Sequence, residues 1–135
     1  MTNAPQNTTQ PAGPQRIRRV FVRELEIVAS VGVYRAEQHY EQRVLISVDL
    51  QVVDDYDGQS EKLADVLDYG RLADSIERLA QSAHFTLIET LAARIAELAL
   101  EDQRVIKALV RVEKPDILPA ARSVGIEIER TRAQG

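Results

Sequence analysis

Two charged residues at the ends of predicted elements are the first candidates for chemistry. Lys114 lies where a predicted strand stops beside Pro115, and its amine could point into a cleft and act as a base if burial disfavours its charge. Glu89 lies near the start of a predicted helix, where its carboxylate could bind two neighbouring N–H donors of a planar heterocycle. Each has a plain alternative. Lys114 could be a solvated surface lysine, and Glu89 could complete a capping box with Thr86.

Tyr69 and Glu37 are two further candidates. Tyr69 follows Asp68, a plausible helix N-cap, so its phenol could stack on a ring or relay a proton, or it could be a half-buried structural aromatic. Glu37 lies in the long connection after Gly32, where a carboxylate could receive substrate hydroxyls, although charged loop residues are usually just solvated. The residues by themselves leave these alternatives open.

The periodicity of apolar residues predicts the elements that must position these side chains. Alternation of apolar and polar residues predicts four strands, and a period near 3.6 predicts two helices. The strands are predicted at Ile17–Ile27, Arg43–Val53, 106–112 and 124–129, and the helices at Tyr69–Ser82 and Leu87–Glu101. The order β-β-α-α-β-β predicts an α+β domain whose two helices cover one face of a four-stranded, mainly antiparallel sheet.

Length and composition indicate one globular domain between two polar tails. The chain has 135 residues, of which 44% are hydrophobic and 28% charged, as in soluble proteins. Residues 1–15 are rich in Asn, Gln, Thr and Pro and have no apolar stretch typical of a secretory signal, so we expect a disordered tail. We expect the folded domain at 16–130 and a short C-terminal tail at 131–135.

Several classes of function are disfavoured. The chain has no cysteine, which rules out disulfides and thiolate chemistry and fits a reducing compartment such as the cytoplasm. His39 and His84 are far apart and no glycine-rich phosphate loop follows a strand, so we predict neither a metal nor a nucleotide cofactor. A net charge of −4 without a long basic run argues against nucleic acid, and the apolar runs are too short to cross a membrane.

Four stretches together resemble the dihydroneopterin aldolase family in content and in order. They are Gly32-Val33-Tyr34-Arg35-Ala36-Glu37-Gln38, Asp65-Val66-Leu67-Asp68-Tyr69, Phe85-Thr86-Leu87-Ile88-Glu89 and Val112-Glu113-Lys114-Pro115. Each is weak alone, but four in register with the β-β-α-α-β-β pattern are specific. The resemblance covers about 17–130, which is essentially the whole predicted domain.

This resemblance implies the tunnelling fold, in which subunits join their sheets into barrel rings. Tetrameric rings that stack in pairs would make a homo-octamer and would close the two open edges that a single four-stranded sheet leaves. It also implies active sites between subunits, with Tyr69 supplied by the chain next to the one that supplies Glu89 and Lys114. The partners expected are therefore copies of the same chain and a small pterin.

The resemblance also implies a role for each candidate residue in folate synthesis. Glu89 would anchor the amino and ring N–H groups of the pterin, helped by backbone groups near Ile88 and Leu67. Glu37 would bind the trihydroxypropyl side chain. Lys114 would take the proton of the 2′-hydroxyl, and glycolaldehyde would leave.

The same resemblance explains why neither a metal nor a lysine Schiff base is expected. The C6=N5 imine of the reduced pterin would accept the electrons, and Tyr69 would relay the proton that yields 6-hydroxymethyl-7,8-dihydropterin. Reversal of the aldol step after rotation of the aldehyde would give epimerisation to dihydromonapterin.

Two alternatives stay open. A dihydroneopterin triphosphate epimerase shares this fold, and Arg35 and Arg43 could meet a triphosphate, although Lys114-Pro115 favours the aldolase. From another class, the chain could be a catalytically silent pterin-binding module that uses the fold only to assemble. The presence of all four candidate residues argues against the silent module.

Overall fold

The computed structural model describes residues 16–132, so the predicted tail 1–15 and residues 133–135 lie outside the described part. Its elements are β1 (Ile17–Ala29), α2 (Arg35–Gln38), β2 (Gln42–Val53), η1 (Leu63–Asp65), α3 (Tyr69–Gln81), α4 (Ile88–Ala99), β3 (Val105–Lys114) and β4 (Val124–Thr131). The predicted order of strands and long helices is confirmed. The short helical turns α2 and η1 lie in the two longest connections, and β4 reaches one residue past the predicted end of the domain.

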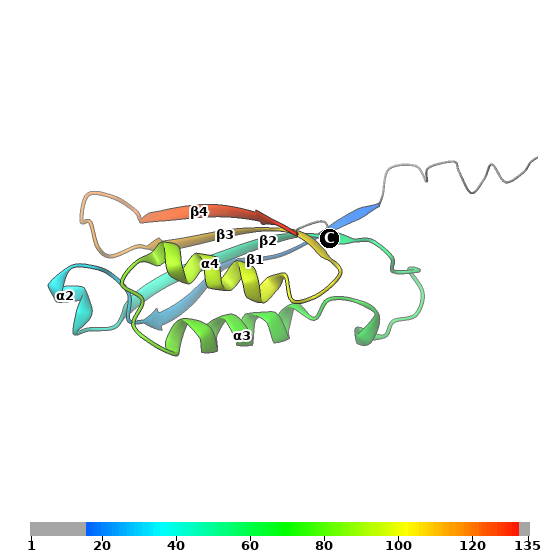
Figure 1. Ribbon diagram of the computed structural model, residues 1–135, viewed down its shortest axis with the longest axis horizontal. Helices are drawn as coiled ribbons and strands as arrows, with labels where there is room; N and C mark the ends of the chain where they lie inside the picture. The colour runs from blue at the N-terminus through cyan, green and yellow to red at the C-terminus, as the bar shows by residue number, and fades with distance from the viewer. Residues whose placement is uncertain (1–15, 133–135) are drawn as a thin grey trace, which may run out of the picture.

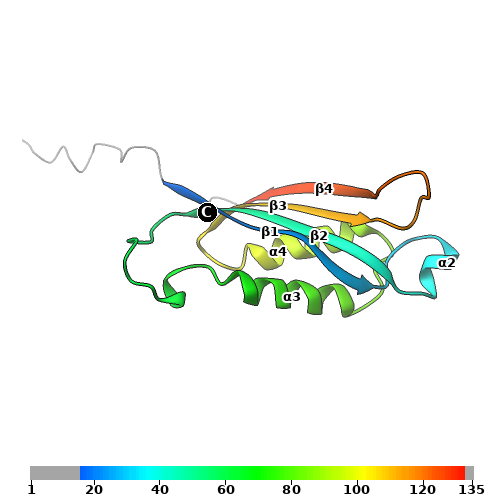
Figure 2. The same cartoon turned by 180° about the vertical axis from the view of Figure 1, so that it is seen from behind.

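The four strands form one sheet in the order β1-β2-β3-β4, and all three pairings are antiparallel. β2 and β3 are neighbours in the sheet although both long helices separate them in the sequence. Figures 1 and 2 show α3 and α4 side by side on the same face of this sheet. The predicted α+β architecture is therefore confirmed, with one face of the sheet covered and the other open.

The core lies between the sheet and the two helices. Alternate residues of β2 point into it, from Val44 to Val52, and each of them is at most 2% exposed. α4 contributes a stripe of large residues with small ones between them, which lets the helix approach the sheet closely. The buried residues of that stripe are Leu91, Ala92, Ile95, Ala96 and Ala99.

The first strand has a β-bulge that explains its weaker alternation in the sequence. The pairing of β1 with β2 shifts between Val22 and Leu25, and Glu24 adopts a left-handed backbone conformation with φ of 55°. Its N–H donates to Ser47 Oγ at 2.9 Å. The extra residue keeps Leu25 and Ile27 on the core side, where strict alternation would have turned them outward.

The start of α3 follows the prediction. Asp68 is the N-cap, and its Oδ1 accepts from the Arg71 N–H at 3.1 Å. The helix ends at Gln81, one residue before the predicted end. Between residues 16 and 132, none of the helices is long and apolar enough to cross a membrane.

Candidate active site

The fold brings Glu37 and Lys114 together from 77 positions apart in the sequence. Lys114 is the last residue of β3, and its Nζ lies 2.8 Å from Oε2 of Glu37 in α2. Both side chains are nearly buried, with 4% of Glu37 and 11% of Lys114 exposed. Taking two charges out of water costs several kcal/mol per ion unless further hydrogen bonds compensate, so the surroundings of this pair matter.

Glu37 has these further bonds. Gln42 Nε2 donates to Glu37 Oε2 at 2.9 Å, and the Tyr34 N–H donates to Oε1 at 3.2 Å. Burial is the largest influence on the pKa of Glu37 and acts to raise it, but the bonds from Lys114, Gln42 and Tyr34 outweigh it and hold that pKa below its ordinary value. Glu37 is therefore a carboxylate in a fixed orientation with a cation beside it.

Gly32 makes room for that carboxylate. Its φ of +122° is a backbone conformation that residues with a side chain rarely adopt. A Cβ at this position would lie 2.1 Å from Cδ of Glu37. Gln42 Nε2 also donates to the Val31 carbonyl at 2.9 Å, which ties the start of β2 to the segment that carries Gly32. The sequence predicted Glu37 and Lys114 as separate candidates, but it gave no sign of Gln42, a single polar residue at the start of a strand.

Ile88 and Glu89 begin α4 at the same end of the molecule as α2 (Figure 1). Ile88 is buried and Glu89 is exposed in the first turn. The predicted capping box is wrong, because Leu87 is the N-cap and no side chain caps the helix. Phe85 forms a parallel bridge with Val31, and Leu87 has an extended backbone before the chain turns into the helix.

The loss of the capping box leaves the Glu89 carboxylate free for another role. In the part of the chain that the structure describes, no hydrogen bond or ion pair uses it. It lies in the first turn of α4, where the helix dipole favours a negative charge. The alternative that tied Glu89 to Thr86 is thereby removed.

Leu67 and Tyr69 lie at the opposite end of the helical layer. Tyr69 begins α3 beside η1, whereas Ile88 begins α4 beside α2, and Figures 1 and 2 place these two starts at opposite ends. Leu67 is 7% exposed and Tyr69 is 66% exposed, so Tyr69 is no half-buried structural aromatic. Both line a pocket of about 310 Å³ against the first half of β1, from Arg18 to Phe21. Within one chain, Tyr69 does not join Lys114.

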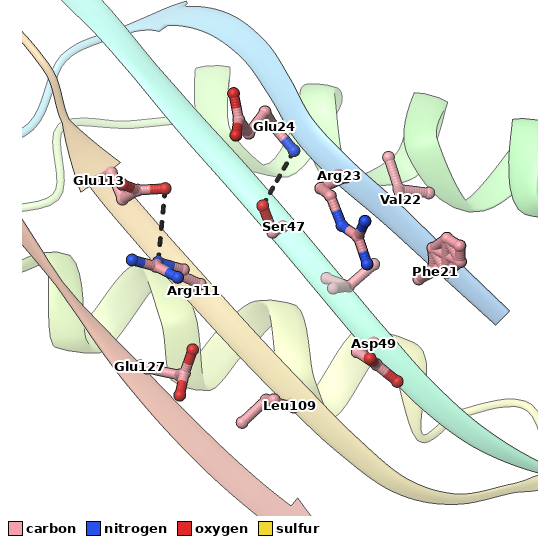
Figure 3. A pocket seen from close by; sticks show the side chains of 11 residues that line it. Phe21, Val22, Arg23, Glu24, Ser47, Asp49, Leu109, Arg111, Glu113 and Glu127 are labelled. Carbon is pink, nitrogen blue, oxygen red and sulfur yellow. Dashed lines mark hydrogen bonds and ion pairs between the residues drawn. The ribbon is translucent and has the colours of Figure 1, made fainter. Parts of the chain in front are cut away.

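The open face of the sheet has a different hollow, with a volume of about 290 Å³. Figure 3 shows its side chains, among which Arg111 points at Glu113 and Ser47 accepts from the Glu24 N–H. None of the predicted site residues lines it. The hollow is thus separate from the Glu37–Lys114 pair, and the buried ion pair is the stronger indication of chemistry.

Arg43 forms ion pairs with two carboxylates at the surface. Its guanidinium donates to both carboxylate oxygens of Asp116, at 3.3 and 3.0 Å, and to Glu26 at 3.3 Å. Asp116 and Glu26 compete with any phosphate for the same donors. Arg35 lies exposed in α2. Between residues 16 and 132, no group of three or more His, Cys, Asp and Glu side chains is placed to hold a metal ion.

Comparison with known proteins identifies the family of the chain. The model of the family described as dihydroneopterin aldolase (FolB) matches residues 20–129. The dihydroneopterin aldolase of Escherichia coli K12 is 30% identical over 111 residues, which cover 82% of this chain and 91% of that protein. The dihydroneopterin aldolase of Streptococcus pyogenes serotype M6 is 34% identical over 104 residues, covering 75% of this chain and 87% of that protein.

A solved structure gives the same result at the level of the fold. The E. coli dihydroneopterin aldolase in complex with neopterin superimposes with a TM-score of 0.78 at 29% identity, covering 84% of this chain and 98% of that chain. The fold described above is the tunnelling fold that the sequence implied. With a family model that spans both the Glu37–Lys114 pair and the Leu67–Tyr69 segment, the chain belongs to the dihydroneopterin aldolase family.

Proposed function

We propose that this chain cleaves the side chain of 7,8-dihydroneopterin in the cytoplasm, giving 6-hydroxymethyl-7,8-dihydropterin and glycolaldehyde for folate synthesis. The observation that carries the proposal is the buried Glu37–Lys114 pair at the end of the molecule where the carboxylate of Glu89 has no partner among the described residues. A neutral heterocycle with adjacent N–H donors and a polyhydroxylated tail fits one unpaired carboxylate and one buried acid–base pair.

Glu89 anchors the pterin ring in this proposal. Its carboxylate accepts from the amino and ring N–H groups of the pterin, and backbone groups near Ile88 complete that edge. The bidentate geometry favours a planar amidine-like edge over other heterocycles, because both oxygens are used at once. Glu37 then accepts hydrogen bonds from the hydroxyls of the side chain.

Lys114 is the proposed base. In the free protein its amine donates to Glu37 Oε2 at 2.8 Å, so the amine is engaged before substrate binds. Substrate hydroxyls that donate to Glu37 replace this contact, so the amine can lose its proton to water and then accept the proton of the 2′-hydroxyl, directly or through a water molecule. The bond between C1′ and C2′ breaks and C2′ leaves as the aldehyde carbon of glycolaldehyde.

The electrons of that bond go to the pterin. They form a C6=C1′ double bond while N5 is protonated, so the ring itself is the electron sink and we propose no metal and no Schiff base. Tyr69 relays the proton that C1′ then takes up to become the hydroxymethyl carbon. If the retained aldehyde rotates and C1′ adds to the other face of the aldehyde carbon, C2′ is inverted and the product is dihydromonapterin. This is the isomerase activity that we expect beside the lyase.

Tyr69 and Leu67 come from a neighbouring subunit in this proposal. β1 and β4 each have one strand neighbour in the sheet, so each has an open edge that a second copy can pair with. Joining β1 of one copy to β4 of the next gives tetrameric rings, and two rings stack into an octamer. The 310 Å³ pocket beside Tyr69 would then face the Lys114 end of the adjacent chain.

A triphosphate epimerase and a silent pterin-binding module are the alternatives. The Lys114-Pro115 dipeptide favours the aldolase over the epimerase. The buried Lys114 disfavours the silent module, since binding alone needs no desolvated amine.

The test is incubation of the purified protein with 7,8-dihydroneopterin and a chelator, followed by chromatography of the products. A second sample of protein is treated with borohydride in the presence of substrate, freed of both by gel filtration and assayed again. We expect equal amounts of 6-hydroxymethyl-7,8-dihydropterin and glycolaldehyde from both samples. Loss of activity with the chelator would overturn the metal-free proposal, and inactivation by borohydride would indicate an imine. A preference for the triphosphate would favour the epimerase.

A further inference from the structure

His84 bonds through both nitrogens of its ring to a single segment of the chain. Its Nδ1 lies 2.6 Å from Ser30 Oγ, and its Nε2 lies 3.0 Å from the carbonyl oxygen of Gly32. A carbonyl oxygen can only accept, so Nε2 carries a proton and donates it. Nδ1 then accepts from the Ser30 hydroxyl in the neutral ring. A histidine with both nitrogens engaged has a fixed ring orientation.

The backbone repeats this connection beside the ring. The Gly32 N–H donates to the Phe85 carbonyl at 2.9 Å, and the Phe85 N–H donates to the Ser30 carbonyl at 3.1 Å. These bonds form the bridge between Val31 and Phe85. The segments 30–32 and 84–85 are thus joined by two backbone bonds and by the His84 ring.

The two joined segments lead to the two halves of the proposed site. Gly32 forms the wall against the Glu37 carboxyl, since a Cβ at Gly32 would lie 2.1 Å from its Cδ. Two residues further on, the Tyr34 N–H donates to Glu37. On the other segment, Phe85 is followed by Ile88 and Glu89 at the start of α4. A movement of 30–32 relative to 84–85 therefore changes the position of Glu37 relative to Glu89.

We propose that His84, together with Ser30, is a positioning residue that holds the Glu37–Lys114 pair in register with the Ile88–Glu89 anchor. The inference rests on the proposed function for its catalytic consequence, but its structural part stands on the contacts alone. His84 touches no reacting atom in this scheme. It fixes how far the base lies from a substrate that Glu89 anchors, and a misplacement of about 1 Å can cost about 100-fold in rate.

The test compares His84→Ala and Ser30→Ala with His84→Gln, which keeps an N–H donor for the Gly32 carbonyl. Ser82→Ala is the matched control, because the Ser82 hydroxyl donates to the Leu79 carbonyl at its own helix end and has no other side-chain bond among residues 16–132. We expect kcat to fall about tenfold or more in His84→Ala. The Kd for neopterin should change less than about threefold, because Glu89, which anchors the pterin ring, is intact. His84→Gln should recover most of the kcat.

Hydrogen exchange followed by mass spectrometry provides the second readout, without substrate. We expect amides of segments 30–38 and 84–88 to exchange faster in His84→Ala, with Ser82→Ala at the wild-type rate. Wild-type exchange in His84→Ala, equal losses of kcat and neopterin binding, or a His84→Gln variant as impaired as His84→Ala would each overturn the inference. If the wild-type protein does not cleave dihydroneopterin, the proposed function fails and exchange alone decides the positioning role.

Discussion

The two ends of the helical layer are built in opposite ways. At the lysine end, which comprises Glu37, Lys114 and the start of α4, the Glu37–Lys114 ion pair is buried and bonded within one chain. The tyrosine end, with Leu67 and Tyr69, has a phenol that is 66% exposed above an open pocket. A buried ion is stable only if its partner is buried with it when the chain folds. An exposed phenol needs no partner in the folded chain and can bind another chain later.

This difference explains how a site between subunits can be assembled reliably. The costly part of the site, the desolvated ion pair, forms inside a single folding unit. The part left for assembly is an amphipathic side chain that loses little by being exposed. The lysine end should therefore respond to mutation both in activity and in stability, and the tyrosine end mainly in activity.

The largest expected effect separates chemistry from anchoring within the lysine end. Lys114→Ala should lower kcat by about 100- to 10,000-fold and keep most pterin binding, because general base catalysis is worth that much. Glu89→Ala should lose binding itself. Single-turnover rates and calorimetric titration with neopterin measure the two quantities. Equal loss of binding in both variants would contradict the division of roles.

The next effect tests whether the two ends meet between chains. We expect Tyr69→Phe and Lys114→Ala each to be impaired when refolded separately. An equal mixture refolded together should regain about one quarter of the wild-type activity. In randomly assembled rings, about one site in four combines an unsubstituted Tyr69 with an unsubstituted Lys114. Each variant refolded alone is the control. A mixture no more active than the mean of the two would mean that the two ends do not meet between chains.

The third effect concerns stability at the lysine end and its dependence on pH. Glu37→Gln leaves the Lys114 amine without a counter-charge, so we expect it to lower the free energy of unfolding by about 3–5 kcal/mol at pH 7. The pKa of Glu37 is lowered in the folded state, so its contribution is present above its ordinary value of 4.5 and is lost as the pH falls through the folded pKa.

Denaturant unfolding of wild type and Glu37→Gln at several pH values measures this difference, which should shrink on acidification. Asp116→Asn is the control, because Arg43 also lowers the pKa of Asp116 but this pair is exposed and contributes little. A difference that stays constant between neutral pH and pH 3 would show that the charge of Glu37 is not what stabilises the fold.

The sequence predicted the elements better than the contacts between them. Alternation in 43–53 identified β2 because one face of that strand is buried throughout. β1 was less clear because the bulge at Glu24 resets its alternation, and a bulge depends on the partner strand. The capping box failed because Phe85 pairs with Val31, a contact across 54 positions that no local pattern reports.

The same limit applies to the site. Glu37 and Lys114 were identified as separate candidates, and only the fold makes them an ion pair. Gln42, Ser30 and His84 carry no motif, and their importance comes from the atoms they meet after folding. These contacts join residues that are far apart in the sequence. They are therefore determined by the topology of the fold and not by local propensity.

The smallest effect tests the tyrosine end as a structural unit. Asp68→Ala removes the bond from the Arg71 N–H to the N-cap carboxylate, so we expect a loss of about 1 kcal/mol in stability, seen as a lower midpoint in urea. Because Tyr69 is the next residue, kcat should fall as well, while neopterin binding, which the Glu89 carboxylate provides, stays largely intact. Asp68→Asn, which can still cap, should keep both stability and kcat. If Asp68→Ala lowered the free energy of unfolding as much as Glu37→Gln, the two ends would not differ as proposed. The tyrosine end would then stabilise the fold of the single chain and would not be mainly a surface for assembly.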